Sequence, residues 1–346
     1  ALKTNGPVGF GINSFDRMNN TWNKMGLSNI KTSIDGNEIF NMDLNSFSYD
    51  EWRHINTFID YPYYKNKKIR IQKLYIEEFN PLDMYKRSLG DGVVKINETN
   101  VTYLYSVKLF DFNKNQSEIL VPIQWVKQND LSNRKLDFKN MFKVNKDSAY
   151  NFKFPGAKVS IEKNSFYTDK IIQIFEENNL LHVDKDSIPL LKGITIKMDV
   201  SRYNDSIKNK TYIGRIGENK KSSFVSSKKE ENYVIAKVNN LGDFVIKIDS
   251  IKPNVSVIDI SDNQWISNRK NLSIKISDNE SGVKNYRGTI NDKWILLEYN
   301  PMKGILSYDF NDNVNKDDAK NVLEIKIEDN VGNEKKLIKT FYRKIK

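Results

Sequence analysis

The sequence predicts an all-β protein built from three consecutive β-sandwich, Ig-like modules with at most short helical insertions. Apolar and polar residues alternate with a period of two through much of the chain, which is typical of half-buried strands. Turn residues separate the alternating runs. The 346 residues are enough for two or three domains of roughly 150 residues each, and the 18 Phe, 17 Tyr and 5 Trp supply apolar surface that disordered chains lack.

A β-hairpin is predicted near the start of the chain. Residues 30–34 and 38–42 alternate, and Asp35-Gly36 stands between them. An Asp-Gly pair favours a type I′ turn, because both central residues of that turn need a positive φ. Further strands are predicted at the ranges 103–109, 233–238, 244–248, 323–327 and 337–342. The last two flank the glycine-bearing loop 329–333 and predict a second hairpin.

A short helix is predicted after residue 48. Ser48 and Glu51 have the spacing of a capping box. Trp52, Ile55 and Phe58 are expected to anchor this insert in the first module, and Pro62 is expected to end it.

Two changes in composition predict the module boundaries. Polar runs at 127–130 and 132–135 follow a strand-rich stretch, and Pro253 fixes an extended link after a strand that ends near residue 249. We therefore predict modules at 1–127, 128–250 and 251–346. In the last module we expect Tyr286, Trp294 and Ile295 to lie in the core.

Composition excludes some kinds of chemistry. The chain has no cysteine, so neither a disulfide framework nor a thiolate site is available, and no apolar run reaches the ~18 residues of a membrane-spanning helix. The net charge of +11 has two interpretations, solvated lysines or binding of an anionic partner such as a cell-wall polymer. The basic residues are scattered among acids, which favours solvated lysines and disfavours nucleic acid as the partner.

The sequence contains no recognisable catalytic centre. His182 and Asp186 match His-x-x-x-Asp, a zinc-ligand pair, but no His-x-His exists to complete the site, so we interpret the match as chance. His54 is expected to have a structural role. Gly6, Gly9 and Gly11 do not form a phosphate loop, and they are interpreted as strand glycines beside a close neighbour or a bulge.

Two weaker binding hypotheses remain open. Asp278 and Asp329 begin turn sequences that could donate oxygens to Ca²⁺ at a module edge, although the preference of Asn, Asp and Gly for turns explains the same residues. Trp265 and Trp294 could be exposed platforms for a sugar, against the alternative that both pack in a core.

Several segments together resemble the region after the catalytic domain in a group of lysostaphin-type (LytM-like) zinc metallopeptidases of Gram-negative bacteria. The segments that carry the likeness are GPVGFGI at 6–12, FDRMN at 15–19, FSYDE at 47–51, HINTFIDY at 54–61, RIQK at 70–73, VSIEKNSFYTD at 159–169, ISDNESG at 276–282 and YRGTINDKWIL at 286–296. They extend over nearly the whole chain, and those in the last module are the most specific.

The resemblance implies a non-catalytic accessory or binding region of a secreted zinc metalloendopeptidase of the peptidoglycan-hydrolase type, which positions or regulates an upstream catalytic domain. It implies a secreted, periplasmic or outer-membrane-associated protein, with that domain, envelope proteins or peptidoglycan as partners. Zinc is expected only in the upstream domain, and this chain is expected to hold no cofactor. The alternative is a stand-alone envelope interaction protein, a subunit of an outer-membrane or secretion assembly.

Overall fold

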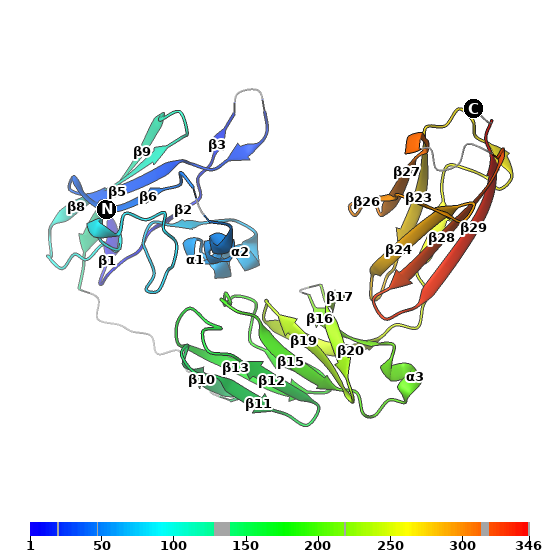
Figure 1. The fold of residues 1–346 in the computed structure, drawn as a ribbon. Coiled ribbons are helices and arrows are strands. Elements are labelled where there is room, and N and C mark those ends of the chain that lie inside the picture. The colour runs from blue at the N-terminus through cyan, green and yellow to red at the C-terminus, as the bar shows by residue number, and fades with distance from the viewer. Residues whose placement is uncertain (19–20, 47, 128–138, 218, 313–317, 345–346) are drawn as a thin grey trace.

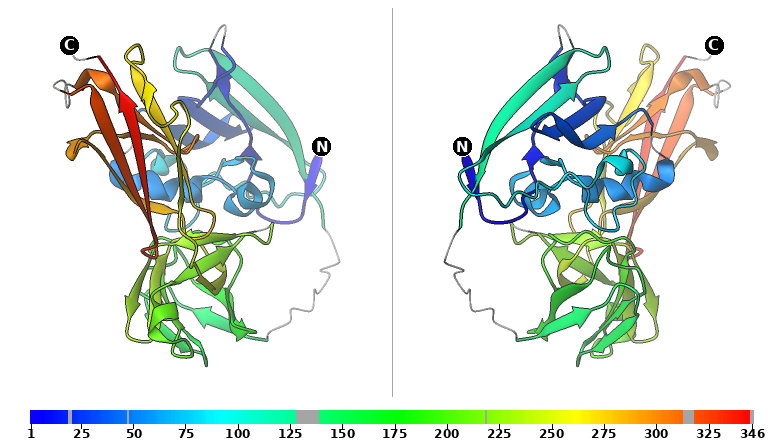
Figure 2. Two further views of the ribbon diagram at one scale, coloured as in Figure 1. Left: turned by 90° about the vertical axis from the view of Figure 1, so that its right-hand side faces the viewer. Right: turned by 90° about the vertical axis from the view of Figure 1, so that its left-hand side faces the viewer.

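The computed structural model describes residues 1–18, 21–46, 48–127, 139–217, 219–312 and 318–344. Its sheets fall into three groups along the chain, with strands within residues 2–125, 141–248 and 254–342. Each described sheet takes all of its strands from one of these ranges. We call the groups the first, middle and last modules. The first and last modules rise from the same side of the middle module (Figures 1 and 2). The all-β prediction is confirmed. The polar runs used to place the first boundary fall largely at 128–138, outside the described residues.

The first module is a five-stranded sheet covered on one face by irregular chain. The sheet order is β1-β9-β8-β5-β6, with β1 parallel to β9 and the other pairs antiparallel. Its strands are β1 (Leu2–Thr4), β5 (Asn29–Ile34), β6 (Asn37–Asp43), β8 (Thr102–Phe110) and β9 (Gln116–Trp125). The covering layer and its outlying hairpin contain β2 (Gly11–Ile12), β7 (Gln72–Lys73), β3 (Asp16–Arg17), β4 (Lys24–Met25), η1 (Tyr49–His54), α1 (Ile55–Phe58), α2 (Tyr61–Lys67) and η2 (Arg87–Leu89).

The first hairpin has the predicted turn. Asp35 and Gly36 have φ of +46° and +84°, so both central residues are left-handed, as a type I′ turn requires. The helical insert differs from the prediction. The Ser48–Glu51 capping box is present, but Trp52 and Ile55 are exposed and only Phe58 is buried. The predicted anchoring by Trp52 and Ile55 is therefore wrong, because the helix changes from 3-10 in η1 to α in α1 between them, so that a single α-helical spacing does not place them on the inner face with Phe58.

Pro62 does not end the helical region. It stands in the first turn of α2, where a proline needs no hydrogen-bond donor, and Asp60 caps the same turn by accepting from the Tyr63 N–H at 3.0 Å. Lys68 closes the helix in a left-handed conformation. The sequence Asp-Tyr-Pro is thus a helix start, and it places α2 beside the middle module.

The middle module is a sandwich of two antiparallel sheets with one core between them. Buried Val159 and Ile196 come from one sheet, and Ile172, Leu181 and Phe244 from the other. The six-stranded sheet runs β10 (Met141–Val144), β13 (Lys170–Glu177), β14 (Leu180–Val183), β20 (Gly242–Ile248), β16 (Thr211–Ile216) and β17 (Ser222–Val225). The five-stranded sheet runs β11 (Tyr150–Lys153), β12 (Ala157–Ile161), β15 (Ile194–Asp199), β19 (Tyr233–Val238) and β18 (Ser227–Glu230), and α3 (Asp205–Lys208) precedes β16.

The last module is also a two-sheet sandwich. One sheet runs β21 (Asn254–Val257), β23 (Asn271–Ser277), β27 (Ile305–Asp309) and β26 (Glu298–Asn300). The other runs β22 (Gln264–Trp265), β29 (Glu334–Tyr342), β28 (Lys320–Asp329), β24 (Val283–Ile290) and β25 (Lys293–Ile295), and η3 (Phe310–Asp312) follows β27. The predicted terminal hairpin is β28–β29. Ile295 is buried and Tyr286 packs at the edge of the core, but Trp294 is 55% exposed, so its predicted burial is wrong.

Among the described residues, the structure has no helix that combines the length and the apolar character needed to cross a membrane.

Candidate functional site

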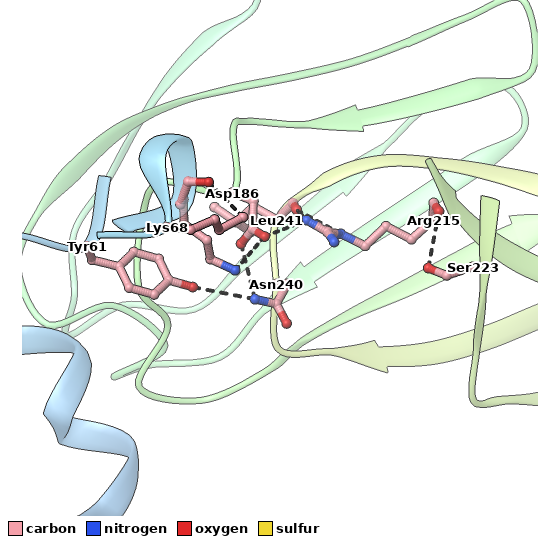
Figure 3. Close-up of polar contacts among 8 residues, drawn as sticks. Tyr61, Lys68, Asp186, Arg215, Ser223, Asn240 and Leu241 are labelled. Atoms are coloured by element: carbon pink, nitrogen blue, oxygen red, sulfur yellow. Dashed lines mark hydrogen bonds and ion pairs between the residues drawn. The ribbon is translucent and has the colours of Figure 1, made fainter. Parts of the chain in front are cut away.

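Polar side chains that are distant in sequence meet at the two junctions between modules. At the first junction, between the first and middle modules, α2 presents Tyr61 and Lys65 one turn apart. The Tyr61 side chain points toward the loop ends of the middle module (Figure 3), and Lys65 Nζ reaches Asp186 of that module at 2.7 Å. The cap at Asp60 and the proline at the helix start fix this orientation.

Asp186 is the centre of the first junction. Its Oδ2 accepts from Lys65 Nζ and from Arg215 Nη2, both at 2.7 Å, and its Oδ1 accepts from Asn240 Nδ2 at 3.1 Å. The amide of Asn240 also lies 3.4 Å from the Tyr61 hydroxyl. Because hydrogen bonds between charged groups are stronger than those between neutral ones, these contacts join the first and middle modules through Asp186.

The electrostatics of Lys65 agree with this geometry. Burial alone would lower the pKa of Lys65, but its hydrogen bonds to Asp186 and Tyr61 and the attraction of the Asp186 charge raise it above the ordinary value. Burial raises the pKa of Tyr61 in turn. Arg215 is also held within the middle module, since its Nε and Nη2 donate to the Leu241 carbonyl at 3.1 and 2.7 Å.

His182 and Asp186 do not face a common ion. His182 Nδ1 lies 2.6 Å from Asp243 Oδ1 and its ring stacks on Phe175, with centroids 4.6 Å apart. Asp186 is occupied by the junction contacts. Both residues line an open depression of about 710 Å³ together with Lys65 and Arg215.

His54 contributes to the first junction in a way that the sequence does not indicate. Its Nδ1 lies 2.9 Å from the hydroxyl of Tyr167 in the middle module, with the two rings edge to face. Burial raises the pKa of Tyr167 to about 12, so this hydroxyl stays protonated at neutral pH. A cation–π contact of Lys146 with the Phe79 ring, 3.5 Å from its centroid, adds a further link.

The second junction, between the middle and last modules, gathers three carboxylates. Asp249 follows β20, Asp278 follows β23 and Asp329 ends β28, and one carboxylate oxygen of each lies within 4.8 Å of the others. Of the His, Cys, Asp and Glu side chains that the structure describes, only these three are grouped closely enough to share a metal ion. The two residues that the sequence offers for calcium are therefore brought together, with Asp249 as a third that it did not indicate.

Hydrogen-bond donors already surround these carboxylates. Asp249 Oδ2 accepts from the N–H and hydroxyl of Ser281 at 3.1 and 2.6 Å. Asp329 accepts from the backbone N–H groups of Val331 and Asn333 at 2.9 and 2.8 Å, and Asp278 accepts from two N–H groups of its own turn. Oxygen ligands of this kind suit Ca²⁺, while the same donors stabilise the negative charges with no ion.

The pKa of Asp278 reflects the close approach of the three carboxylates. Burial raises it above the ordinary value, and the charges of Asp249 and Asp329 raise it further, against the lowering effect of the N–H donors of Gly282 and Glu280. The cluster therefore makes ionisation of Asp278 less favourable in the folded protein than in the unfolded chain.

The two tryptophans considered as sugar platforms are both exposed. Trp265 is 61% exposed and stacks on Tyr342, with centroids 5.3 Å apart, while Trp294 is 55% exposed at the opposite edge of the same sheet. The alternative that they pack in the core is excluded by this exposure.

The comparisons with known proteins describe parts of this architecture. A family model described as a Zu5-like domain matches residues 139–249, the range of the middle module. No curated protein sequence matches the chain. Similar solved structures include immunoglobulin domains 1–4 of Sidekick-1 (6% identity, 99% of this chain and 73% of that chain, TM-score 0.20) and the protocadherin gammaB4 extracellular domain (8% identity, 99% and 48%, TM-score 0.21). Protocadherin gammaB7 EC3-6 is a third (10% identity, 99% and 71%, TM-score 0.17).

Proposed function

We propose that this chain is a non-catalytic accessory region of a secreted zinc metalloendopeptidase of the peptidoglycan-hydrolase type. Its three modules would hold an upstream catalytic domain in position against the cell wall, and zinc would belong to that domain. The likeness of the segments at 6–19, 47–61 and 276–296 to the region after the catalytic domain of lysostaphin-type peptidases supports the link to a peptidase.

The observation that carries the positioning role is the pair of polar junctions. Lys65, Asp186 and Arg215 join the first two modules through partly buried charges. Asp249, with no exposed surface, joins the middle module to Ser281 of the last. Buried polar contacts need specific geometry to form, so they favour one arrangement of neighbouring modules over a freely jointed chain. Modules held at fixed angles to one another can position an attached domain, whereas flexibly linked modules cannot.

The first test is the intact mass of the native protein from its source, compared with the 40.4 kDa of this chain. A product larger by about 100–200 residues, the size of one domain, is expected. The larger product should lose peptidase activity on chelation of zinc, and this chain by itself should sediment with purified sacculi or bind the catalytic domain. A native product of the same mass as this chain would contradict the proposal and favour a stand-alone envelope interaction protein.

A further inference from the structure

A cavity of about 280 Å³ lies between the first and middle modules, beside the Asp186 contacts. Its walls come from residues within 56–62 and 73–80 of the first module and within 167–170 and 187–189 of the middle module. Its volume is close to the lower end, roughly 300 Å³, of pockets that hold small ligands. It can therefore hold a small ligand of a few residues.

Charged groups of both signs line this cavity. Lys73 is only 9% exposed and its Nζ contacts Glu77 Oε1 at 2.6 Å, so this pair forms a neutral part of the wall. The half-buried Lys170 and the exposed Glu78 also line it. Neither of these two side chains forms an ion pair with another residue in the described part of the chain. They leave one positive and one negative group available on opposite modules.

Aromatic rings supply the apolar part of the wall. The hydroxyls of Tyr61 and Tyr167 are bound to neighbours outside the cavity, Asn240 and His54, so each phenol ring is held in place. Phe79 is 52% exposed and has a φ of +64°. That conformation is unfavourable for a bulky residue, and such strain is found most often at binding and active sites.

We infer that this cavity binds a short peptide as a whole, with its terminal carboxylate on Lys170, its terminal amino group on Glu78 and a small side chain against the tyrosine rings. This inference rests on the proposed function, because a peptide is the substrate class of a wall endopeptidase. Groups of both signs disfavour a polyanion, and the volume disfavours a polysaccharide.

The charge requirement is tested by isothermal titration calorimetry on the full chain with trialanine, which carries one amine and one carboxylate. Titration at about 15 and 35 °C prevents a heat near zero from hiding binding. Trialanine is expected to bind, and acetyl-trialanine amide, which lacks both charges, is expected to bind at least about tenfold more weakly. Absence of binding at about 5 mM trialanine, or equal binding of the two ligands, would overturn the inference.

Matched variants test the residues. Lys170→Gln and Glu78→Gln should each weaken trialanine binding about fivefold or more. Lys163→Gln and Glu177→Gln make the same charge changes at exposed positions of the middle module away from the cavity, and should stay within about twofold. Binding by Lys170→Gln equal to that of the unmodified chain would remove Lys170 from the site and overturn the inference.

A wall stem tetrapeptide separates this inference from the proposed function. Tighter binding than trialanine would support both. Binding of trialanine with no preference for the stem peptide would leave the peptide site in place and count against a peptidoglycan substrate. A native product that carries an active peptidase domain, together with a cavity that binds no peptide, would contradict the cavity inference alone.

Discussion

The side-chain amide of Asn333 donates a 3.0 Å hydrogen bond to the backbone carbonyl of Asp249, 84 residues earlier in the chain. The same nitrogen lies 3.2 Å from the Ile251 carbonyl and 2.6 Å from Asp329 Oδ2. The turn of the terminal hairpin thus holds the link between the middle and last modules, and it does so from a nearly buried position.

Asn333→Ala should destabilise the second junction. The change leaves acceptors of Asp249 and Asp329 without a donor, and a buried unsatisfied group costs about 1–3 kcal/mol. Hydrogen exchange of β28, β29 and residues 249–251 should accelerate accordingly. Asn285→Ala, at an exposed position of the same module, is the matched control and should leave exchange within about 0.5 kcal/mol of the original. Similar exchange rates in the two variants would contradict the role assigned to Asn333.

Asp186→Asn should loosen the first junction. Removal of the carboxylate charge leaves Lys65 and Arg215 partly buried without a counter-ion, which should cost about 1–2 kcal/mol at this degree of burial. Exchange of α2 amides reports the change. Lys65→Met should cost less than Asp186→Asn because Arg215 and Asn240 still bind Asp186, and Lys67→Met, on the exposed side of α2, should have no effect.

A double-mutant cycle of Lys65→Met with Asp186→Asn isolates the contact itself. The coupling free energy should be about 0.5–1 kcal/mol and should fall as salt is added, since the pair is partly exposed. A coupling of zero would show that α2 is held at the middle module by its other contacts.

The acid cluster predicts a pH dependence that Asp278→Asn removes. The folded pKa of Asp278 lies above its unfolded value of 3.8, so the native state holds this proton more tightly. The stabilisation is therefore fully present below about pH 3.8 and is lost as pH rises through the folded pKa. Asparagine keeps an oxygen for the turn N–H groups and has no charge. The variant should match the original near pH 3.8 and become more stable than it, by a few tenths of a kcal/mol, toward pH 7.

Urea unfolding of the two proteins between pH 4 and 7 measures this difference, in which the titration of groups that do not interact with Asp278 cancels. A variant that is less stable at pH 7 would contradict the prediction. Stabilisation of the original by millimolar Ca²⁺, absent in Asp278→Asn, would instead assign the three carboxylates to a cation.

Two neighbours in β25 separate core from surface. Ile295 is 1% exposed, so Ile295→Ala should cost about 2–5 kcal/mol. Trp294 is 55% exposed, and Trp294→Ala should cost less than about 1 kcal/mol in the same urea unfolding experiment. A loss of several kcal/mol at Trp294 would contradict its exposed position.

These two residues also mark what the sequence can predict. A period of two identifies a strand, and the Asp35-Gly36 turn fixes a register locally, so the all-β class and both hairpins follow from the sequence. The alternation does not say which of its two faces is buried. Trp294 is large and apolar and was assigned to the core, yet it pairs across the strand with Thr289 on the outer face of the sheet.

The junctions were less predictable for a different reason. Asp278 and Asp329 could be identified as turn residues, but their meeting with Asp249 depends on the angle between two modules, which no local pattern encodes. The same holds for Lys65 and Asp186, which are 121 residues apart. The start of α2 has a helix-start pattern in Asp60 and Pro62, but the sequence prediction places Pro62 at a helix end instead.

Gly9 and Gly6 allow the interpretation of the early glycines, as residues beside a close neighbour, to be tested by substitution. A Cβ built on Gly9 would lie 2.5 Å from Tyr75 Cδ1, whereas one built on Gly6 would meet nothing within 4 Å. This contact agrees with the interpretation of Gly9 as a glycine beside a close neighbour. Gly9→Ala should therefore cost about 1–3 kcal/mol, because the Tyr75 ring must shift. Gly6→Ala makes the same chemical change in open space and should leave the urea midpoint of the first module unchanged, which makes it the matched control. Equal midpoints for the two variants would mean that the Tyr75 ring moves aside at little cost, and that a side chain at position 9 is compatible with this packing.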